Sequence, residues 1–330
     1  MNSIKETLQN WIPSKLIFEK DIHLCRWLYT KNQPFTDPFF GETVMKCLPF
    51  PENSKQFKCT TSVEMIAEWA QHIDAVYPTA FIFHVSRCGS TLVSQALGMN
   101  SENISLSEVA LFDELLKLPM NEHNTDDKKT NELLAGAITF YGARRTLREK
   151  RLFIKTDSWH LFFYKQLRTL YPNIPFIILY RTPDEVLKSN SRKKGMQGNP
   201  EFVPPALFVF DEPLETFIHP DQYMALVLEK YFCNIIEIAT NDGSNLLLNY
   251  NEGLSAMMQK ISAFTGMELS PEEERGIAER SVFNAKYPGE KFVEKNMVAH
   301  DNQSRGKLAE LYDETERLRD RQCIRLNFPR

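Results

Sequence analysis

The chain has 330 residues, of which 42% are hydrophobic and 25% are charged, and its formal net charge at pH 7 is −4. This is the composition of an ordinary globular protein that can bury a sizeable core. The slight acidic excess argues against binding of nucleic acid over a broad surface, because such proteins carry a basic surplus. A local cationic pocket for a small anion is still compatible with it.

Cysteine usage and hydropathy exclude two further classes. The 6 cysteines are irregularly spaced and include no CxxC pair, so neither a zinc site nor a disulfide framework is predicted. There is no run of about 18 apolar residues, and the N-terminus lacks a signal-peptide core. We therefore expect a cytoplasmic protein with reduced thiols and no membrane span.

Residues 1–78 are interpreted as an N-terminal extension, mostly helical, that packs on the core. Within it, Ser62 is a candidate N-cap, and apolar residues recur at helical spacing up to Ala70. No residue of this extension has an evident catalytic role.

From residue 79 onward, short apolar runs alternate with helical patterns. The expected strands lie at 80–85, 104–107, 152–155, 176–180 and 246–250. The expected helices between them lie at 92–97, 109–118, 131–148, 160–171, 183–193 and 221–239. This alternation predicts an α/β fold of the three-layer P-loop type over residues 79–330, with a central parallel sheet flanked by helices. In such sheets, ligands bind at the carboxyl ends of the strands.

Two further segments have distinctive composition. Residues 195–220 are rich in proline and aromatic side chains, which favours a lid or a wall of the acceptor pocket. A last helix is expected near 304–322, and its alternating charges predict a solvated face.

A polar turn, Ser86–Thr91, follows the first strand and precedes a helix. Free backbone N–H groups at a helix N-terminus bind anions, and Gly89 allows the backbone to approach a ligand closely. Arg87 adds a positive charge that can form two hydrogen bonds to one oxyanion. The ATP-binding loop GxxxxGK[ST] is matched only at its end, because Ser90 stands where that motif has its lysine.

A second anion element follows the strand at 176–180. Arg181 ends this strand, Thr182 is a candidate N-cap, and Pro183 suits the first helical position. Ser189 lies about two helical turns after Thr182, so it returns to the side of Arg181. Arg181 and Ser189 together can hold one phosphate group.

The two elements resemble the family of sulfotransferases that use 3′-phosphoadenosine 5′-phosphosulfate (PAPS). The nearest branch contains the tyrosylprotein sulfotransferases and related bacterial enzymes, which also have arginine in the first loop. The resemblance covers residues 81–295. It implies that the loop (Arg87, Cys88, Gly89, Ser90 and Thr91) binds the 5′-phosphosulfate and that Arg181 and Ser189 bind the 3′-phosphate.

The same resemblance implies further site residues. Glu108 would be the general base, and Lys155 would neutralise charge on the bridging oxygen, alongside Arg87. Tyr250 and Ser281 would lie near the cofactor. A later lysine of that branch has no unique counterpart, since Lys291 and Lys295 both compete for it, and Lys193 is a further candidate for a cofactor contact.

Simpler interpretations remain open for several residues. Glu108 could cap the helix that begins near Val109, and Lys155 could be a solvated strand end. His84 fits a core position, and His160 ranks after Glu108 as a base. Cys88 fits the loop as a small side chain.

The expected function is transfer of a sulfuryl group from PAPS to a hydroxyl acceptor by in-line displacement, with no metal. The acceptor would be a small molecule, a lipid or a peptide, and no nucleic acid partner is expected. A nucleotide-dependent phosphotransferase on the same fold and a non-catalytic nucleotide-binding relative are the alternatives. The sequence does not distinguish among acceptors or oligomeric states.

Overall fold

The computed structural model describes residues 7–19, 22–54, 56, 58–120, 126–192, 194–210, 219–281 and 305–328. The chain divides into two compact units, which are described separately below. The first unit comprises residues 1–81, 94–157 and 166–172. The second unit comprises residues 82–93, 158–165 and 173–330. The division expected at residue 79 between an extension and a core stays a prediction.

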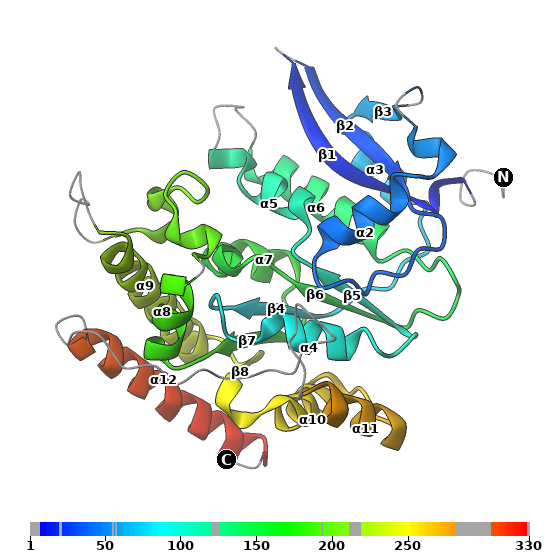
Figure 1. Cartoon of the computed structure of the whole chain (residues 1–330). Coiled ribbons are helices and arrows are strands. Elements are labelled where there is room, and N and C mark those ends of the chain that lie inside the picture. The colour runs from blue at the N-terminus through cyan, green and yellow to red at the C-terminus, as the bar shows by residue number, and fades with distance from the viewer. Residues whose placement is uncertain are drawn as a thin grey trace. The chain divides into compact units, whose positions relative to one another are not determined.

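The central element is a five-stranded sheet with the order β5-β6-β4-β7-β8 (Figure 1). Its strands are β4 (Pro78–His84), β5 (Asn103–Ser107), β6 (Arg151–Lys155), β7 (Phe176–Tyr180) and β8 (Asn245–Asn249). The pairs β5–β6 and β7–β8 are parallel, with Ser107 opposite Lys155 and Tyr180 opposite Asn249. Every residue of β5, β7 and β8 is buried, as parallel strands covered on both faces require. The predicted α/β class with a central parallel sheet flanked by helices is confirmed.

The first unit also contains a second, antiparallel sheet, which the sequence did not indicate. It consists of β1 (Trp11–Glu19), β2 (Ile22–Tyr29) and β3 (Thr60–Ser62). The helices α2 (Phe40–Cys47) and α3 (Met65–Ala70) and the 3-10 turn η1 (Pro51–Asn53) also precede β4. The expectation of a mostly helical segment over residues 1–78 is therefore wrong.

This antiparallel sheet shares a hydrophobic core with two helices of the first unit. These are α5 (Ala110–Leu116) and α6 (Asp127–Tyr141), with η2 (Leu118–Met120) between them. Tyr141 is fully buried, and its ring packs 5.1 Å from Phe40 and 5.0 Å from Phe112 between centroids. Its hydroxyl donates a 2.8 Å hydrogen bond to the carbonyl oxygen of Pro13 in β1. The segment before β4 is thus held by aromatic packing and a satisfied buried hydroxyl.

The second unit places long helices against β7 and β8. Its helices are α8 (Pro183–Arg192), α9 (Pro220–Asn241), α10 (Leu254–Thr265), α11 (Pro271–Arg280) and α12 (Arg305–Arg325). Its 3-10 turns are η3 (Ser158–Phe163), η4 (Met196–Gly198), η5 (Pro205–Phe208) and η6 (Tyr250–Glu252). Helices α9 and α12 lie side by side and both contact β8 (Figure 1). Along the chain, β4, α4 (Ser90–Leu97) and α7 (Tyr164–Leu170) contribute residues to both units.

All six cysteines are free thiols, and four of them are buried. Burial raises the pKa of Cys25 to about 12 and that of Cys47 to about 11, so both remain thiols near neutral pH.

Among the described residues, none of the helices has the length and hydropathy needed to cross a membrane.

Candidate functional site

The turn after β4 has an unusual backbone in the second unit. Arg87 has φ 65° and Gly89 has φ 79°, so two of its residues lie in the left-handed region. A Cβ atom on Gly89 would overlap the ring atoms Cδ2 and Cε2 of Tyr250. Glycine is therefore required here both by the backbone conformation and by the aromatic ring packed against it. Helix α4 begins directly afterwards at Ser90, and it contains Thr91.

The turn is anchored to the end of β7. The N–H of Val85 donates a 3.0 Å hydrogen bond to the carbonyl oxygen of Leu179, and the thiol of Cys88 donates to the same oxygen at 3.4 Å. Cys88 is fully buried, so its thiol is shielded from solvent. His84 is also buried and contacts the carbonyl oxygen of Val85 through Nδ1 at 3.1 Å, as a core histidine would.

The second predicted anion element lies against the same aromatic ring. Arg181 follows β7 directly, and its guanidinium carbon lies 4.6 Å from the ring centroid of Tyr250. The Arg181 side chain is only 10% exposed, and it forms a 2.8 Å ion pair with Glu185. A cation stacked on an aromatic face gains electrostatic stabilisation as well as packing. Gly89 and Arg181 thus both lie against the ring of Tyr250.

Helix α8 begins at Pro183, where the sequence predicts the first helical position. The carbonyl oxygen of Thr182 accepts the N–H groups of Glu185 and Val186, both at 3.1 Å. The Thr182 hydroxyl donates to the carboxylate of Glu185. Ser189 lies in this helix and is partly exposed. Sequence reasoning identified Arg181 and Ser189 but overlooked Glu185, although its i,i+4 spacing from Arg181 could have indicated the ion pair.

Glu108 and Lys155 form an ion pair in the first unit. Glu108 follows β5 with φ 54°, and its N–H donates a 2.9 Å hydrogen bond to the carbonyl oxygen of Lys155. The Lys155 side chain is fully buried, whereas that of Glu108 is 25% exposed. The ring of Phe39 covers the ammonium group at 5.7 Å from Nζ to the centroid. The Lys155 ammonium donates a hydrogen bond to Oε1 of Glu108.

This geometry bears on two interpretations that the sequence left open. Helix α5 begins at Ala110, with Val109 as its N-cap and no side-chain capping hydrogen bond. Glu108 is therefore engaged with Lys155, and the interpretation of Lys155 as a solvated strand end is wrong. His160 is buried in η3 of the second unit.

Other predicted residues lie at the end of α11 or outside the described part of the chain. Ser281 is exposed at the C-cap of α11, where its hydroxyl donates a 2.6 Å hydrogen bond to the carbonyl oxygen of Ala278. The competing lysines, Lys193, Lys291 and Lys295, lie outside the described residues.

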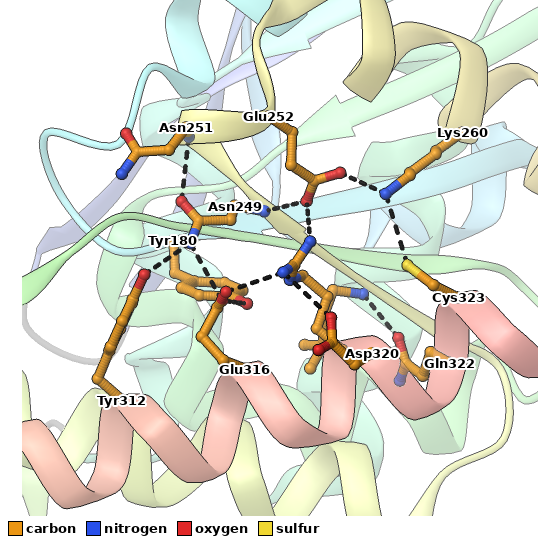
Figure 2. A network of polar contacts seen from close by, with 12 residues as sticks. Tyr180, Asn249, Asn251, Glu252, Lys260, Tyr312, Glu316, Asp320, Gln322 and Cys323 are labelled. Atoms are coloured by element: carbon orange, nitrogen blue, oxygen red, sulfur yellow. Dashed lines mark hydrogen bonds and ion pairs between the residues drawn. The ribbon is translucent and has the colours of Figure 1, made fainter. Parts of the chain in front are cut away.

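A polar network that sequence reasoning missed joins the ends of β7 and β8 to α12 (Figure 2). The phenol of Tyr180 donates to Glu316, and the amide of Asn249 donates to Glu316 at 3.0 Å and to the Tyr312 hydroxyl at 2.9 Å. Burial raises the pKa of Tyr180 far above its ordinary value, and Glu316 raises it further. The last residues of β7 and β8 are therefore both held by α12.

The network continues from Glu252 to α10 and α12. One carboxylate oxygen of Glu252 accepts the N–H of Asn249 at 2.8 Å and pairs with Arg319 at 3.2 Å. The other pairs with Lys260, whose side chain is 3% exposed. Burial lowers the pKa of Arg319, but Tyr180 and the carboxylates Glu316 and Glu252 outweigh it and raise the pKa above its ordinary value. The prediction that the last helix has a solvated face is wrong where Glu316 and Arg319 of α12 contact Tyr180, Asn249 and Glu252.

A cavity of about 310 Å³ lies in the part of the second unit predicted as an acceptor wall. Its lining includes Lys194, Met196, Phe202, Pro220 and Tyr223. Tyr223 is 1% exposed, and its hydroxyl has no hydrogen-bond partner within the described parts of the chain. Burial raises the pKa of Tyr223 to about 12, so this hydroxyl is neutral.

The chain matches no protein-family model, and it has no significant match among curated proteins. Several solved structures are similar to it, among them three sulfotransferases. A sulfotransferase from Alicyclobacillus acidocaldarius is 16% identical, with TM-score 0.38, covering 62% of this chain and 91% of that one. The sulfotransferase domain from the curacin biosynthetic pathway is 16% identical, with TM-score 0.41, covering 78% and 99%. A sulfotransferase from Mycobacterium avium is 13% identical, with TM-score 0.46, covering 81% and 82%. These values are too low to place the chain in a family.

Proposed function

We propose that this protein is a sulfotransferase that transfers a sulfuryl group from PAPS to a hydroxyl acceptor. The observation that carries the proposal is the meeting of two anion elements at one aromatic ring. The loop glycine and Arg181 are far apart in sequence, yet both pack on Tyr250. A ligand with phosphate groups at two positions fits such a pair of elements better than a ligand with one.

The residues of the second unit would hold the nucleotide as follows. Arg87, the N–H of Gly89 and the hydroxyls of Ser90 and Thr91 would bind the 5′-phosphosulfate at the N-terminus of α4. Arg181 and Ser189 would bind the 3′-phosphate. Arg181 already pairs with a carboxylate, so its surroundings accept a negatively charged group. Tyr250 would lie near the nucleotide, and the resemblance adds Ser281.

The reaction would be an in-line displacement at sulfur, in which the acceptor oxygen forms a bond to sulfur as the bond to the bridging oxygen breaks. Glu108 would take the proton of the acceptor hydroxyl as general base. Lys155 and Arg87 would stabilise the negative charge that develops on the departing oxygens. This scheme assigns no step to a metal ion.

We assign the acceptor to the cavity lined by Met196, Phe202 and Tyr223. Its lining is largely apolar, with the exposed Lys194 among its polar groups. The neutral hydroxyl of Tyr223 could pair with a polar atom of the acceptor. These features favour a small hydroxyl-bearing molecule with an apolar body. Part of the predicted acceptor segment, residues 211–218, lies outside the described residues.

A phosphotransferase that uses a nucleoside triphosphate is the alternative function. Ser90 stands where the triphosphate loop has the lysine that reaches the terminal phosphates. A ligand without a 3′-phosphate would also leave Arg181 and Ser189 without the group that they are proposed to bind. Both observations favour the sulfotransferase.

Calorimetry without added metal would test the proposal directly. The wild type should bind PAPS and 3′-phosphoadenosine 5′-phosphate, and it should bind AMP far more weakly. Arg181→Ala should weaken the two 3′-phosphorylated ligands by about 1.5–3 kcal/mol, the value of a hydrogen bond to a charged group. If the protein fails to bind PAPS but binds ATP tightly with magnesium, the sulfotransferase proposal is wrong and the phosphotransferase is favoured.

A further inference from the structure

The carboxylate of Glu185 occupies the position at which Arg181 would hold an anion. Arg181 Nη2 donates to Oε1 of Glu185 at 2.8 Å. The hydroxyl of Thr182 donates to Oε2, and the amide of Asn251 lies 3.4 Å from the same oxygen. Arg181 directly follows β7, Thr182 directly precedes α8, and Asn251 lies in η6. All three donors belong to the second unit.

This arrangement differs from an ordinary surface ion pair on a helix. An exposed i,i+4 pair is worth little, because both side chains stay hydrated. Here the Arg181 side chain is 10% exposed, and one face of its guanidinium is covered by Tyr250. Burial tends to raise the pKa of Glu185, but the hydrogen bonds from Arg181 and Thr182 outweigh it and keep the pKa below its ordinary value. The group at Arg181 is therefore an anion at neutral pH.

A ligand phosphate and the Glu185 carboxylate cannot share these donors without cost. The guanidinium is planar and has a fixed set of N–H groups, of which Nη2 is directed at Glu185. A second anion at that edge would be repelled by the carboxylate at close range. Binding of a phosphate at Arg181 thus requires Glu185 to move away from it.

We propose that Glu185 is a specificity-determining residue, an internal competitor that a ligand anion must displace from Arg181. The proposal rests on the proposed function, which assigns the 3′-phosphate to Arg181. A phosphate monoester carries a charge of about −1.5 to −2 at pH 7 and has three acceptor oxygens, whereas a carboxylate carries one charge. Glu185 therefore lets a phosphate monoester bind and excludes singly charged anions.

The competition lowers the affinity for every ligand that uses Arg181. The apparent dissociation constant equals the intrinsic constant divided by the fraction of molecules in which Arg181 is released. Removal of the carboxylate raises that fraction. Affinity for 3′-phosphorylated nucleotides should then increase, while affinity for AMP, which does not reach Arg181, should stay the same.

The test is Glu185→Gln, measured by calorimetry with 3′-phosphoadenosine 5′-phosphate and with AMP. The matched control is Asp184→Asn, which removes the exposed carboxylate beside it in the same helical turn. Glu185→Gln should tighten the 3′-phosphorylated ligand by about fivefold or more, a typical coupling between two sites. It should leave AMP unchanged, and Asp184→Asn should leave both unchanged. Inorganic sulfate should compete with the ligand more strongly in Glu185→Gln than in the wild type.

Asn251→Ala gives a second route if Glu185→Gln is unstable. It removes one donor that holds the carboxylate, so the 3′-phosphorylated ligand should bind more tightly, by less than in Glu185→Gln. Equal or weaker binding in both variants would overturn the inference, because Glu185 would then orient Arg181 for the ligand. If the wild type binds neither PAPS nor its desulfated product, the proposed function fails and the inference fails with it. If the wild type binds and Arg181→Ala does not, an absent gain in Glu185→Gln refutes the inference alone.

Discussion

The anion region around Tyr250 and the ion pair of Glu108 with Lys155 share one backbone feature and differ in everything else. In each, a charged residue after a strand adopts the left-handed conformation, at φ 65° for Arg87 and φ 54° for Glu108. Non-glycine residues rarely do so without support from their surroundings. Two residues after Arg87, Gly89 packs against the ring of Tyr250. Glu108 pairs with the buried ammonium group of Lys155.

This difference teaches how each region responds to a ligand or a substitution. The donors around Arg181 hold a carboxylate that is one-third exposed and can leave. The ammonium of Lys155 is fully buried, and Glu108 is the carboxylate paired with it. Substitutions in the anion region should therefore change binding more than stability. Substitutions in the ion pair should change both turnover and stability.

The largest expected effect is on turnover at the ion pair. Glu108→Gln should lower the rate of sulfuryl transfer by about 10²–10⁴-fold, the usual contribution of a general base. PAPS affinity should remain close to that of the wild type, because Glu108 is not assigned to the nucleotide. Single-turnover kinetics combined with calorimetry would separate the two quantities. If Glu108→Gln transferred sulfuryl groups at the wild-type rate, Glu108 would not be the general base and its role would be structural.

The next effect is on stability, and it distinguishes the two members of the pair. Glu108→Gln leaves a buried ammonium without its counter-charge, so unfolding free energy should fall by about 3 kcal/mol. Lys155→Met removes the charge and keeps an apolar chain of similar volume, which should cost clearly less. Urea denaturation of both variants would measure the difference. Equal losses of unfolding free energy in the two variants would contradict this explanation. They would mean that the ion pair does not offset the cost of burying the Lys155 ammonium.

Gly89→Ala should act on the anion region with a smaller effect. The added methyl overlaps the ring of Tyr250 and forces a residue without glycine's freedom to φ 79°, which together cost about 1–3 kcal/mol. Binding of 3′-phosphoadenosine 5′-phosphate should weaken by more than this, because the loop proposed to bind the phosphate is displaced. Adding Tyr250→Ala should recover part of the unfolding free energy, because the overlap disappears. A fully additive double-mutant cycle would contradict the contact.

The smallest effect concerns the strain at Arg87. Arg87→Gly and Arg87→Ala should both lose affinity for the nucleotide, since each removes the guanidinium. The glycine variant should be more stable than the alanine variant by about 1 kcal/mol, because only glycine adopts a positive φ without strain. Thermal unfolding of the two variants provides the comparison. Equal midpoints would show that the turn changes conformation once the arginine is absent.

Much of the central sheet and the positions of the anion elements could be predicted from the sequence. Buried parallel strands appear as short apolar runs, and β4 to β8 were all recognised in this way. The loop before α4 and the start of α8 at Pro183 depend on local rules for glycine, proline and helix N-termini. Such rules involve residues only a few positions apart.

The antiparallel sheet before β4 could not be recognised in the same way. Its first strand contains Pro13, and the pairing with β2 shifts between Pro13 and Lys15. An interrupted register breaks the strict alternation by which half-buried strands are identified. The sheet is stabilised by packing on α5 and α6, which follow much later in the chain.

The sequence by itself determined which residues could form anion elements, because loop and helix-start chemistry is local. Only the tertiary structure decided which charges are buried and with whom. Glu316 and Arg319 look like members of a solvated helix face, but their partners Tyr180 and Glu252 come from other elements of the second unit. The physical reason is that the cost of burying a charge depends on neighbours supplied by the fold, and local sequence carries no record of them.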